Sequence, residues 1–353
     1  MAAGIDEKMY KKIFGRAPNT AASVPAPEVI PLGVAAFDGY LVPIGGVPRG
    51  MITEFRGLPS SWKSGAAYHL IAQCQKMDIG TPVLFDAENA FNTWATHAGV
   101  DPENLTYPEM GTDWSTAEEC FKMIAFFISQ KVPLIVVDSL GALTTRAVLE
   151  NIDPSKESRM MSLPKVLKEW INRWIAGISF DKSFTPISLK DSGTAIVFIN
   201  HVYTKIATSN VPVAEHNKYT SGGGFGAKFL AHLGIFFHSV KIEKDKETKR
   251  ALFQHLKLTA VKTRFSEPER FIRFTVDFNN TTYDDIDLLI KVGVDVGIIE
   301  AAGAWYTVEG ERMQGKEKVA IYLNERPELK KRIFSMETKV EEKDPNPFEE
   351  EKL

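Results

Sequence analysis

The chain has 353 residues, 44% of them hydrophobic and 25% charged, which is the composition of a globular protein with one large or two ordinary domains. Its net charge of -3 gives no whole-protein signature of nucleic-acid binding, so a site for a polyanion would have to be a local basic patch. Two cysteines, Cys74 and Cys120, exclude a disulfide framework and an all-cysteine metal site, and without a signal peptide or a run of about 18 apolar residues the chain is expected to be soluble and intracellular.

The first predicted element is a short helix over residues 4–16, with Ile5, Met9 and Ile13 four residues apart on one side. A helix of this length needs a partner surface to be stable in water. Residues 19–27 are rich in Ala, Pro and Ser and predict a linker. We therefore expect an N-terminal arm that docks on a neighbouring subunit, with a frayed terminus as the alternative.

Residues 51–56 predict a strand, and an apolar pattern of helical spacing follows after a short loop. The loop runs from Gly57 to Lys63 and Ser64, which is the spacing of a phosphate-binding loop except that Trp62 replaces the second glycine. In such a loop the backbone N–H groups hold phosphates, the lysine contacts the terminal phosphates and the hydroxyl binds Mg²⁺. The strand, loop and helix therefore predict a nucleotide site.

Trp62 is the departure from this motif. A bulky residue held at positive φ costs on the order of 1–3 kcal/mol. The loop is therefore either impaired, or it tolerates Trp62 because the ring points away from the phosphates or because the turn avoids positive φ.

Three further apolar strands are predicted, each ending in polar residues. Stretches long enough for helices separate them, and this alternation predicts an α/β fold with a mostly parallel central sheet covered on both faces. Because the carboxyl ends of parallel strands meet at one edge of a sheet, we expect the functional groups there. The strands and their polar residues are 81–86 with Asp86 and Glu88, 134–138 with Asp138 and Ser139, and 195–200 with Asn200 and His201.

Two long stretches, residues 144–159 and 202–226, resist burial. The first contains charged residues, and the second ends in a glycine-rich run over residues 221–226. Loops of this length inside a compact domain are usually functional or disordered.

The C-terminal third of the chain predicts more strands and a smaller unit. Strand-like segments cover residues 233–241, 252–262 and 271–278. The smaller unit, from about residue 284 to 336, mixes helix signals with a strand at 303–306. Residues 341–353 hold five glutamates and two prolines and predict a disordered acidic tail.

Seven short motifs follow one another in register, and together they resemble the bacterial RecA and phage UvsX recombinases over residues 28–335. The motifs lie at residues 28–33, 46–50, 85–90, 135–139, 158–162, 198–201 and 302–306. Trp62 and His201 resemble UvsX, in which a bulky aromatic residue precedes the loop lysine, whereas residues 302–314 look closer to RecA. This mixture resembles what a divergent recombinase of the family, such as a phage-encoded one, would carry.

The resemblance implies four segments along the chain. They are an N-terminal arm and linker for subunit docking over residues 1–27, a RecA-type ATPase core over 28–283, a small α+β C-terminal domain over 284–340 and the acidic tail over 341–353. The resemblance also assigns the two long stretches, near residues 144–160 and 202–226, as DNA-binding loops.

The resemblance further implies that ATP and Mg²⁺ bind at the phosphate loop, with Ser64 and Asp138 holding the metal. Trp94 lies where the family has an aromatic ring that stacks on adenine. The interval from Glu88 is one residue shorter here, so a buried core ring is the alternative. The expected nucleotide-binding residues are Gly57, Ser60, Ser61, Trp62, Lys63, Ser64, Trp94 and Asp138.

Glu88 and His201 each lie just after a predicted strand end. A carboxylate at position 88 could orient and deprotonate the water that attacks the γ-phosphate, and the resemblance implies that Glu88 is the catalytic glutamate. His201 would sense the γ-phosphate and link it to the DNA loop that follows. A solvated surface glutamate and a structural histidine are the alternatives.

Lys262 and Arg264 alternate along a predicted strand, so their side chains share one face. The resemblance implies that they reach the ATP of the neighbouring subunit and neutralise developing phosphate charge. Two ordinary solvated cations are the alternative. With Glu88, Lys63 and His201, these residues form the expected catalytic set.

The resemblance implies that the two long loops grip single-stranded DNA without reading its sequence. Small residues let the backbone approach phosphates, cations supply charge, and a ring or branched side chain stacks or wedges between bases. The expected DNA contacts are Arg159, Met161, Tyr203, Lys205, Ile206, Ser221, Gly222, Gly223 and Gly224. Flexible loops without a ligand are the alternative.

The implied function is that of an ATP-dependent homologous recombinase that forms helical filaments on single-stranded DNA and exchanges strands with a homologous duplex. Its implied partners are these DNAs, further copies of the chain, and single-strand-binding and mediator proteins, with no membrane, in the cytoplasm of a bacterial or phage-infected cell. The alternatives are a hexameric helicase motor of the same fold, which would form closed rings, and a non-hydrolysing scaffold that coats DNA.

Overall fold

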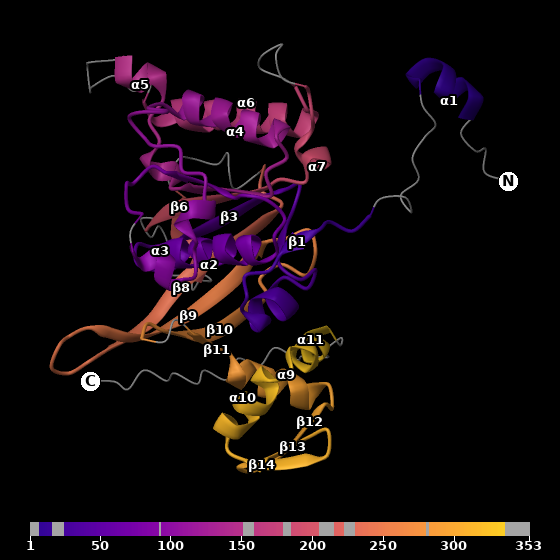
Figure 1. The fold of residues 1–353 in the computed structure, drawn as a ribbon, viewed down its shortest axis with the longest axis vertical. Coiled ribbons are helices and arrows are strands. Elements are labelled where there is room, and N and C mark those ends of the chain that lie inside the picture. The colour runs from indigo at the N-terminus through magenta and orange to yellow at the C-terminus, as the bar shows by residue number, and fades with distance from the viewer. Residues whose placement is uncertain are drawn as a thin grey trace.

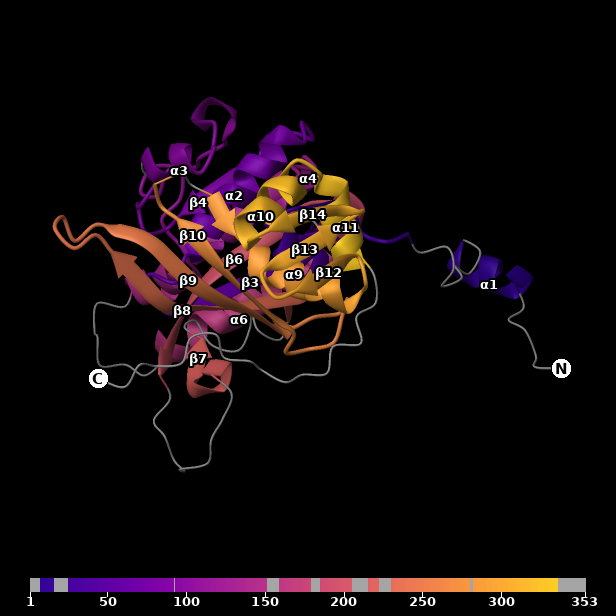
Figure 2. The same ribbon diagram turned by 90° about the horizontal axis from the view of Figure 1, so that it is seen from below.

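The structure is a computed structural model that describes residues 7–15, 25–91, 93–150, 159–178, 185–204, 215–221, 230–279 and 282–335. They form a large α/β body and a smaller C-terminal unit beneath it, while helix α1 (Glu7–Phe14) lies apart from both (Figure 1, Figure 2). The predicted α/β fold, with a mostly parallel central sheet and a small C-terminal domain, is confirmed. Within the described ranges, no helix has the length and apolarity needed to cross a membrane.

The described strands of the large body form one nine-stranded sheet, in the order β11-β10-β9-β8-β3-β6-β5-β4 with β7 paired to β6. The strands from β8 through β3, β6 and β5 to β4 run parallel, and β9, β10 and β11 extend the sheet antiparallel. The bounds are β3 (Ile52–Gly57), β4 (Val83–Asp86), β5 (Leu134–Asp138), β6 (Ala195–Thr204), β7 (Tyr219–Ser221), β8 (Leu233–Lys244), β9 (Ala251–Lys262), β10 (Phe271–Asp277) and β11 (Thr282–Asp284).

Helices cover both faces of the parallel part of this sheet. Helix α2 (Lys63–Lys76) covers one face, and α4 (Ala117–Ser129) and α6 (Arg159–Ala176) lie side by side on the other (Figure 1). Each helix buries apolar residues three or four apart, as Leu70 and Cys74 do in α2, so that an apolar stripe faces the sheet. Helix α4 begins at a capping box in which Thr116 and Glu119 satisfy each other's backbone N–H groups.

Short elements connect these layers. They are β1 (Val29–Ile30) paired with β2 (Val47–Pro48), a π-helix (Ala36–Leu41), α3 (Thr93–His97), α5 (Arg146–Glu150), α7 (Leu189–Ser192) and 3-10 helices at Pro102–Asn104, Leu140–Ala142 and Glu215–Lys218. Parts of both predicted loops are therefore regular: α5 lies in the first, and β7 pairs with β6 in the second.

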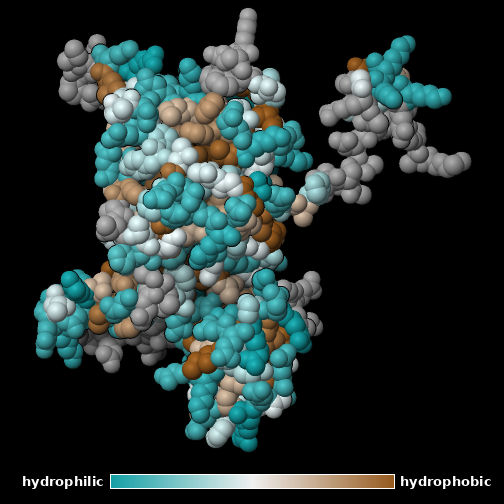
Figure 3. Space-filling view, viewed as in Figure 1, coloured by the Kyte–Doolittle hydropathy of each residue, from teal (hydrophilic) through white to brown (hydrophobic). Residues whose placement is uncertain are grey.

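The C-terminal unit consists of α9 (Ile286–Asp295), an antiparallel sheet of β12 (Ile299–Ala302), β13 (Trp305–Val308) and β14 (Glu311–Gln314), α10 (Lys316–Asn324) and α11 (Pro327–Ser335). The strand predicted at 303–306 begins two residues late, at Trp305. Gly303 has a φ of +61° and makes the turn from β12, a conformation that favours glycine. The face of this unit seen in Figure 3 is mostly hydrophilic.

This unit is docked on the π-helix of the large body. Phe334 packs directly on Gly39, where a Cβ atom would lie 2.4 Å from Phe334 Cβ. A carboxylate oxygen of Asp285 accepts the Ala36 N–H at 3.0 Å. Asp38, on the same π-helix, accepts the backbone N–H groups of Leu32 and Gly33. Burial raises the pKa of its carboxyl group to about 7.

Candidate active site

The phosphate loop lies between the carboxyl end of β3, at Gly57, and the first residue of α2, Lys63. A side chain at Gly57 is excluded, because a Cβ atom would lie 2.3 Å from the carbonyl oxygen of Phe237. Ser60 and Trp62 have φ values of 57° and 70°. The loop thus holds two non-glycine residues in the left-handed region, a strained arrangement that its surroundings must maintain.

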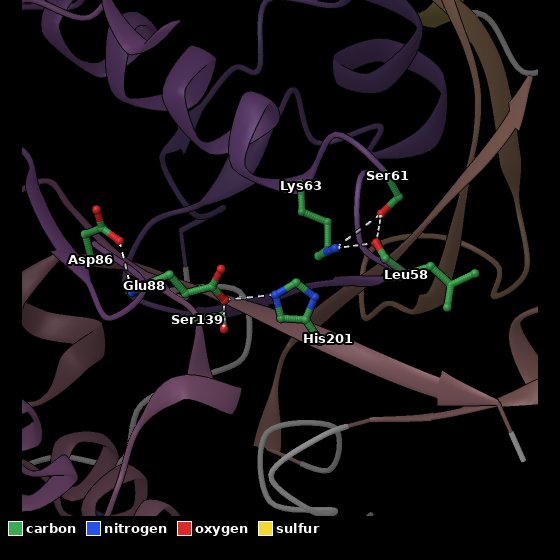
Figure 4. Close-up of polar contacts among 7 residues, drawn as sticks. All are labelled: Leu58, Ser61, Lys63, Asp86, Glu88, Ser139 and His201. Atoms are coloured by element: carbon green, nitrogen blue, oxygen red, sulfur yellow. Dashed lines mark hydrogen bonds and ion pairs between the residues drawn. The ribbon is translucent and has the colours of Figure 1, made fainter. Parts of the chain in front are cut away.

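Lys63 is buried inside this loop (Figure 4). Its Nζ donates to the carbonyl oxygen of Leu58 at 2.7 Å and lies 3.3 Å from the Ser61 hydroxyl, which itself donates to Leu58 at 2.8 Å. Burial lowers the pKa of Lys63 to about 8, and the carboxylates of Asp138 and Glu88 partly oppose this shift. The charges of Glu88, the expected catalytic residue, and of Asp138, an expected metal ligand, therefore both act on Lys63.

The Trp62 ring packs in a buried aromatic cluster on the α2 side of the sheet. Its centroid lies 5.7 Å from that of His69, 5.6 Å from Phe274 and 5.4 Å from Tyr283. The ring also covers Gly65, where a Cβ atom would lie 2.5 Å from the indole Nε1. The loop thus accommodates Trp62 by burying its ring in this cluster, and the turn does not avoid positive φ.

A double-mutant cycle tests this accommodation. Gly65→Ala alone is expected to destabilise the protein by about 1–3 kcal/mol, because the methyl group overlaps the Trp62 ring, which is itself packed against three other rings. In a Trp62→Gly background the same change is expected to stabilise by about 0.5–1 kcal/mol, because alanine is the better helix former. Urea unfolding measures both, and equal effects of Gly65→Ala in the two backgrounds would contradict the packing.

The wild type and the Trp62→Gly variant also test whether the loop binds nucleotide. Trp62→Gly is expected to leave ATP binding intact, since the ring lies in the aromatic cluster. If the wild type cannot bind ATP in equilibrium titration while the glycine variant can, the ring impairs the loop and this interpretation of Trp62 is wrong.

Glu88 contacts two polar residues at the carboxyl edge of the sheet (Figure 4). The Ser139 hydroxyl donates to its carboxylate, and His201 Nε2 lies 2.9 Å from the same oxygen. Burial by itself would raise the pKa of Glu88, but these two hydrogen bonds together with the charges of His201 and Lys63 lower it. The carboxylate is therefore held ionised. The His201 Nδ1 atom is buried and has no hydrogen-bond partner among the described residues.

Asp86 shapes the turn that presents Glu88. It is buried and accepts the backbone N–H groups of Glu88 at 3.1 Å and Phe91 at 2.6 Å, and the Tyr107 hydroxyl at 3.1 Å. Asp86 therefore organises backbone beside the site, while Glu88 is left to contact solvent and ligands.

Ser64 and Asp138, the expected metal ligands, are hydrogen-bonded to each other. Burial raises the pKa of Asp138 to about 6, and the bond from Ser64 opposes this shift. A buried carboxylate beside a hydroxyl supplies the oxygen ligands that Mg²⁺ prefers, and a cation would favour the ionised form of Asp138. The pair therefore fits Mg²⁺.

Trp94 lies on α3 and is partly buried. Its ring stacks on His97 at 5.8 Å and is tilted against Phe278 at 5.7 Å. The position leaves both expectations for Trp94 open, an adenine-stacking ring or a core ring, because one part of the side chain packs against the core and another is exposed.

Lys262 and Arg264 lie far from the phosphate loop of their own chain. Lys262 pairs with Gly234, and Gly234 pairs with Glu54 on β3. Glu54 precedes Gly57 by three residues, about 10 Å at the rise of ~3.3 Å per residue in a strand. Burial lowers the pKa of Lys262, and so does the charge of Arg264. The charges of Arg264 and Glu54 thus act on Lys262, and by register Lys262 lies beside Glu54 rather than beside the phosphate loop.

The described part of the predicted DNA contacts adjoins His201 on β6. Tyr203 is two residues further along this strand and 62% exposed, and Ser221 on β7 pairs with Val202. Arg159 and Met161 lie in the first turn of α6, where the structure describes the backbone and not these side chains. Lys205, Ile206, Gly222, Gly223 and Gly224 lie outside the described residues.

Sequence reasoning missed three supporting residues. Ser139 was placed at the strand end without its role as a donor to Glu88. Tyr107 contacts Asp86 from a distant loop, and Gln254 on β9 donates to the Ser60 carbonyl. A hydroxyl directly after Asp138 was a usable signal for Ser139, whereas the other two contacts join residues far apart in the chain.

Comparison with known proteins gives the same family across nearly the whole chain. The family model of the RecA N-terminal domain matches residues 11–282, and that of the RecA C-terminal domain matches residues 288–343. Protein RecA of Heliobacterium modesticaldum is 31% identical over 311 residues, which cover 88% of this chain and 82% of that protein. Protein RecA of Acidothermus cellulolyticus is 32% identical over 318 residues, covering 90% and 84%. Protein RecA of Aquifex aeolicus is 32% identical over 325 residues, covering 89% and 84%.

Proposed function

Because the chain belongs to the RecA family of recombinases, we propose that it is an ATP-dependent enzyme that polymerises on single-stranded DNA, pairs it with homologous duplex DNA and exchanges strands. The observation that carries this proposal is the contact of Glu88 with Ser139 and His201 at the sheet edge that also holds Lys63. An ionised carboxylate beside a phosphate loop is suited to hydrolysing a nucleoside triphosphate. A histidine on the strand that leads into a predicted DNA loop is suited to linking hydrolysis to DNA.

In the proposed complex, backbone N–H groups of the loop from Gly57 to Ser64, to which Pro59 contributes none, hold the phosphates of ATP, and Trp94 stacks on adenine. Lys63 releases the Leu58 carbonyl and contacts the terminal phosphates, whose negative charge raises its pKa above the value of about 8 in the free protein. Ser64 and Asp138 hold Mg²⁺, which when bound neutralises charge on the phosphate oxygens.

Glu88 is the proposed base. Its lowered pKa keeps the carboxylate ionised, so that it can orient a water molecule and accept its proton. Ser139 and His201 hold the carboxylate in place. A γ-phosphate in the loop would compete with Glu88 for the Nε2–H of His201, which is the proposed sensing step.

Lys262 and Arg264 are proposed to act on the ATP of the neighbouring protomer. Their position near the start of β3, away from their own phosphate loop, supports this, because a head-to-tail assembly brings such a surface against the next subunit's site. Two cations there would neutralise the charge that develops on the phosphates in the transition state.

Coupling to DNA is proposed to run along β6. His201 and Tyr203 are two residues apart on this strand, and β7 pairs with the segment between and beyond them. When His201 changes its hydrogen-bond partner, the positions of Tyr203 and Ser221 would therefore shift. This shift would order or release the predicted DNA-binding loop. The loop residues and Arg159 would then grip the DNA backbone, and hydrolysis would lower DNA affinity.

We also propose finer assignments that follow from the resemblance. Trp62 and His201 support a kinship with UvsX-like recombinases, so a phage-infected or bacterial cell is the expected setting. Single-strand-binding and mediator proteins are the expected partners. Residues 1–27 would act as a subunit-docking arm, which the exposure of Met9 and Ile13 on α1 supports. Residues 28–283 and 284–340 are the proposed core and C-terminal domain.

Electron microscopy with single-stranded DNA and a non-hydrolysable ATP analogue, combined with an ATP hydrolysis assay, tests the function. Open helical filaments and DNA-stimulated hydrolysis are the expected results. Closed rings would instead identify a helicase motor. The absence of both DNA-stimulated hydrolysis and homologous pairing at every salt concentration would reject the proposal.

A further inference from the structure

Gln254 on β9 reaches across to the phosphate loop. Its side chain is almost fully buried, with 3% relative exposure, and its amide nitrogen donates to the Ser60 carbonyl oxygen and to the Ser239 hydroxyl, both at 2.8 Å. Both N–H bonds of the amide are therefore used. A buried amide so placed would leave two unsatisfied partners if it were removed.

The bond to Ser60 fixes the direction of a neighbouring donor. The carbonyl of Ser60 and the N–H of Ser61 belong to one planar trans peptide, in which the two groups point in opposite directions. Because Gln254 holds the carbonyl toward β9, the Ser61 N–H points the opposite way, away from that strand. A phosphate loop works only when its N–H groups face the anion and its carbonyls are satisfied elsewhere.

The other described contacts within the loop do not fix the orientation of the Ser60–Ser61 peptide. Pro59 has no N–H, so the peptide between Leu58 and Pro59 offers no donor, and the Leu58 carbonyl is bonded by Lys63 and Ser61. Ser60 has a φ of 57°, which a serine adopts only when its surroundings impose it. Within the described residues, the bond from Gln254 is the contact that the Ser60 carbonyl receives from outside the loop.

The second bond links the loop to the β8–β9 hairpin. Ser239 lies on β8 beside a register shift, and Gln254 lies on β9 opposite Ile242, in the β8–β9 hairpin whose turn projects from the body in Figure 1 and Figure 2. One amide thus bonds both the phosphate loop and strand β8 of this hairpin.

We propose that Gln254 is a positioning residue for nucleotide binding, which sets the orientation of the Ser60–Ser61 peptide. This inference rests on the proposed binding of ATP in the loop. Gln254 does not touch the nucleotide in this arrangement, since both of its amide N–H bonds are directed to protein atoms.

Three variants test the role. Gln254→Leu removes the donor at similar size, Gln254→Glu replaces the donor with a carboxylate that repels the Ser60 carbonyl, and Ser239→Ala keeps the Ser60 bond as the matched control. Titration with a fluorescent ATP analogue is expected to show a Kd about tenfold higher for Gln254→Leu, because a buried acceptor is left unpaired. Ser239→Ala is expected to stay within about twofold, and kcat at saturating ATP is expected to change little, because the lost interaction is uniform binding.

The Gln254→Glu variant gives a readout that loss of packing would not. A protonated glutamic acid can donate to the Ser60 carbonyl and an ionised one cannot. The ratio of the Kd of Gln254→Glu to the Kd of the wild type is therefore expected to fall toward 1 as the pH is lowered from about 8.5 to 6. A ratio that stays constant while the new carboxyl group is seen to change its protonation overturns the donor role.

Amide hydrogen exchange without nucleotide separates this inference from the proposed function. Residues 57–62 are expected to exchange faster in Gln254→Leu than in the wild type, and to be unchanged in Ser239→Ala, while β3 and β6 stay protected in all three as the check of folding. If the wild type binds ATP and Gln254→Leu binds it equally with unchanged loop exchange, Gln254 does not position the loop. If the wild type binds no ATP, the proposed function fails, and the exchange of the loop still decides the role of Gln254.

Discussion

Replacing Glu88 with Gln is expected to lower the kcat of ATP hydrolysis by about 10²–10⁴-fold, the contribution typical of a general base. The amide has the size of the carboxylate but no negative charge, and it cannot accept a proton from water. The amide oxygen can still accept from Ser139 and His201, which contact one and the same oxygen of Glu88, so the position of the side chain is expected to be kept. Binding of ATP is expected to persist, because the phosphate loop and Lys63 are unchanged. DNA-stimulated phosphate release measures the effect.

The control for this variant is Glu103→Gln, an isosteric change at an exposed residue of the 3-10 helix Pro102–Asn104. It is expected to hydrolyse ATP at the wild-type rate. If Glu88→Gln also retains that rate, Glu88 is not the base, and a DNA-coating scaffold becomes the better description of the protein.

Mixing two inactive variants is expected to restore hydrolysis if the site is completed between protomers. The double variant Lys262→Ala/Arg264→Ala is expected to lose about 10³-fold in kcat, the scale of a transition-state cation supplied in trans. In an equal mixture with Glu88→Gln, some sites are intact. In these sites the double variant supplies Glu88, and a neighbouring Glu88→Gln protomer supplies Lys262 and Arg264. About a quarter of wild-type activity should return if the proteins mix at random along a head-to-tail assembly.

The matched control is a mixture of Glu88→Gln with Lys63→Ala. Both residues serve the site of their own chain, so no protomer in this mixture carries both, and hydrolysis is expected to stay low. Recovery in this control, or none in the first mixture despite co-assembly seen by electron microscopy, would show that Lys262 and Arg264 do not act in trans.

The strands and their terminal polar residues could be predicted because their signals are local. Apolar runs ending in Asp86, Asp138 and Asn200 each report on a few neighbouring residues, and the parallel arrangement then brings them to one edge. The end predicted at Asn200 is wrong, because β6 continues to Thr204 and His201 lies within the strand, where it pairs with β3. From this topology Glu88 and His201 were expected to lie near each other, although they are 113 residues apart in the sequence. Their hydrogen bond itself was not predicted.

The partners of the phosphate loop could not be predicted from the same patterns. The ring of Trp62 meets Phe274 and Tyr283, and Ser60 meets Gln254, so each contact spans about 200 residues of sequence. Which strand lies beside the loop depends on the antiparallel extension of the sheet by β9 and β10, which periodicity does not specify. The DNA-contact residues outside the described ranges stay predictions.

The close contact between Trp62 and Gly65 makes the order of substitutions at these two positions matter. While the indole is present, every side chain larger than hydrogen at position 65 overlaps it, so position 65 can vary only in sequences that have already lost the ring. A mutational library that samples position 65 alone would report it as intolerant, whereas one that varies both positions would recover alanine there. A substitution at position 65 is therefore expected to be tolerated only after Trp62 has been replaced by a smaller residue.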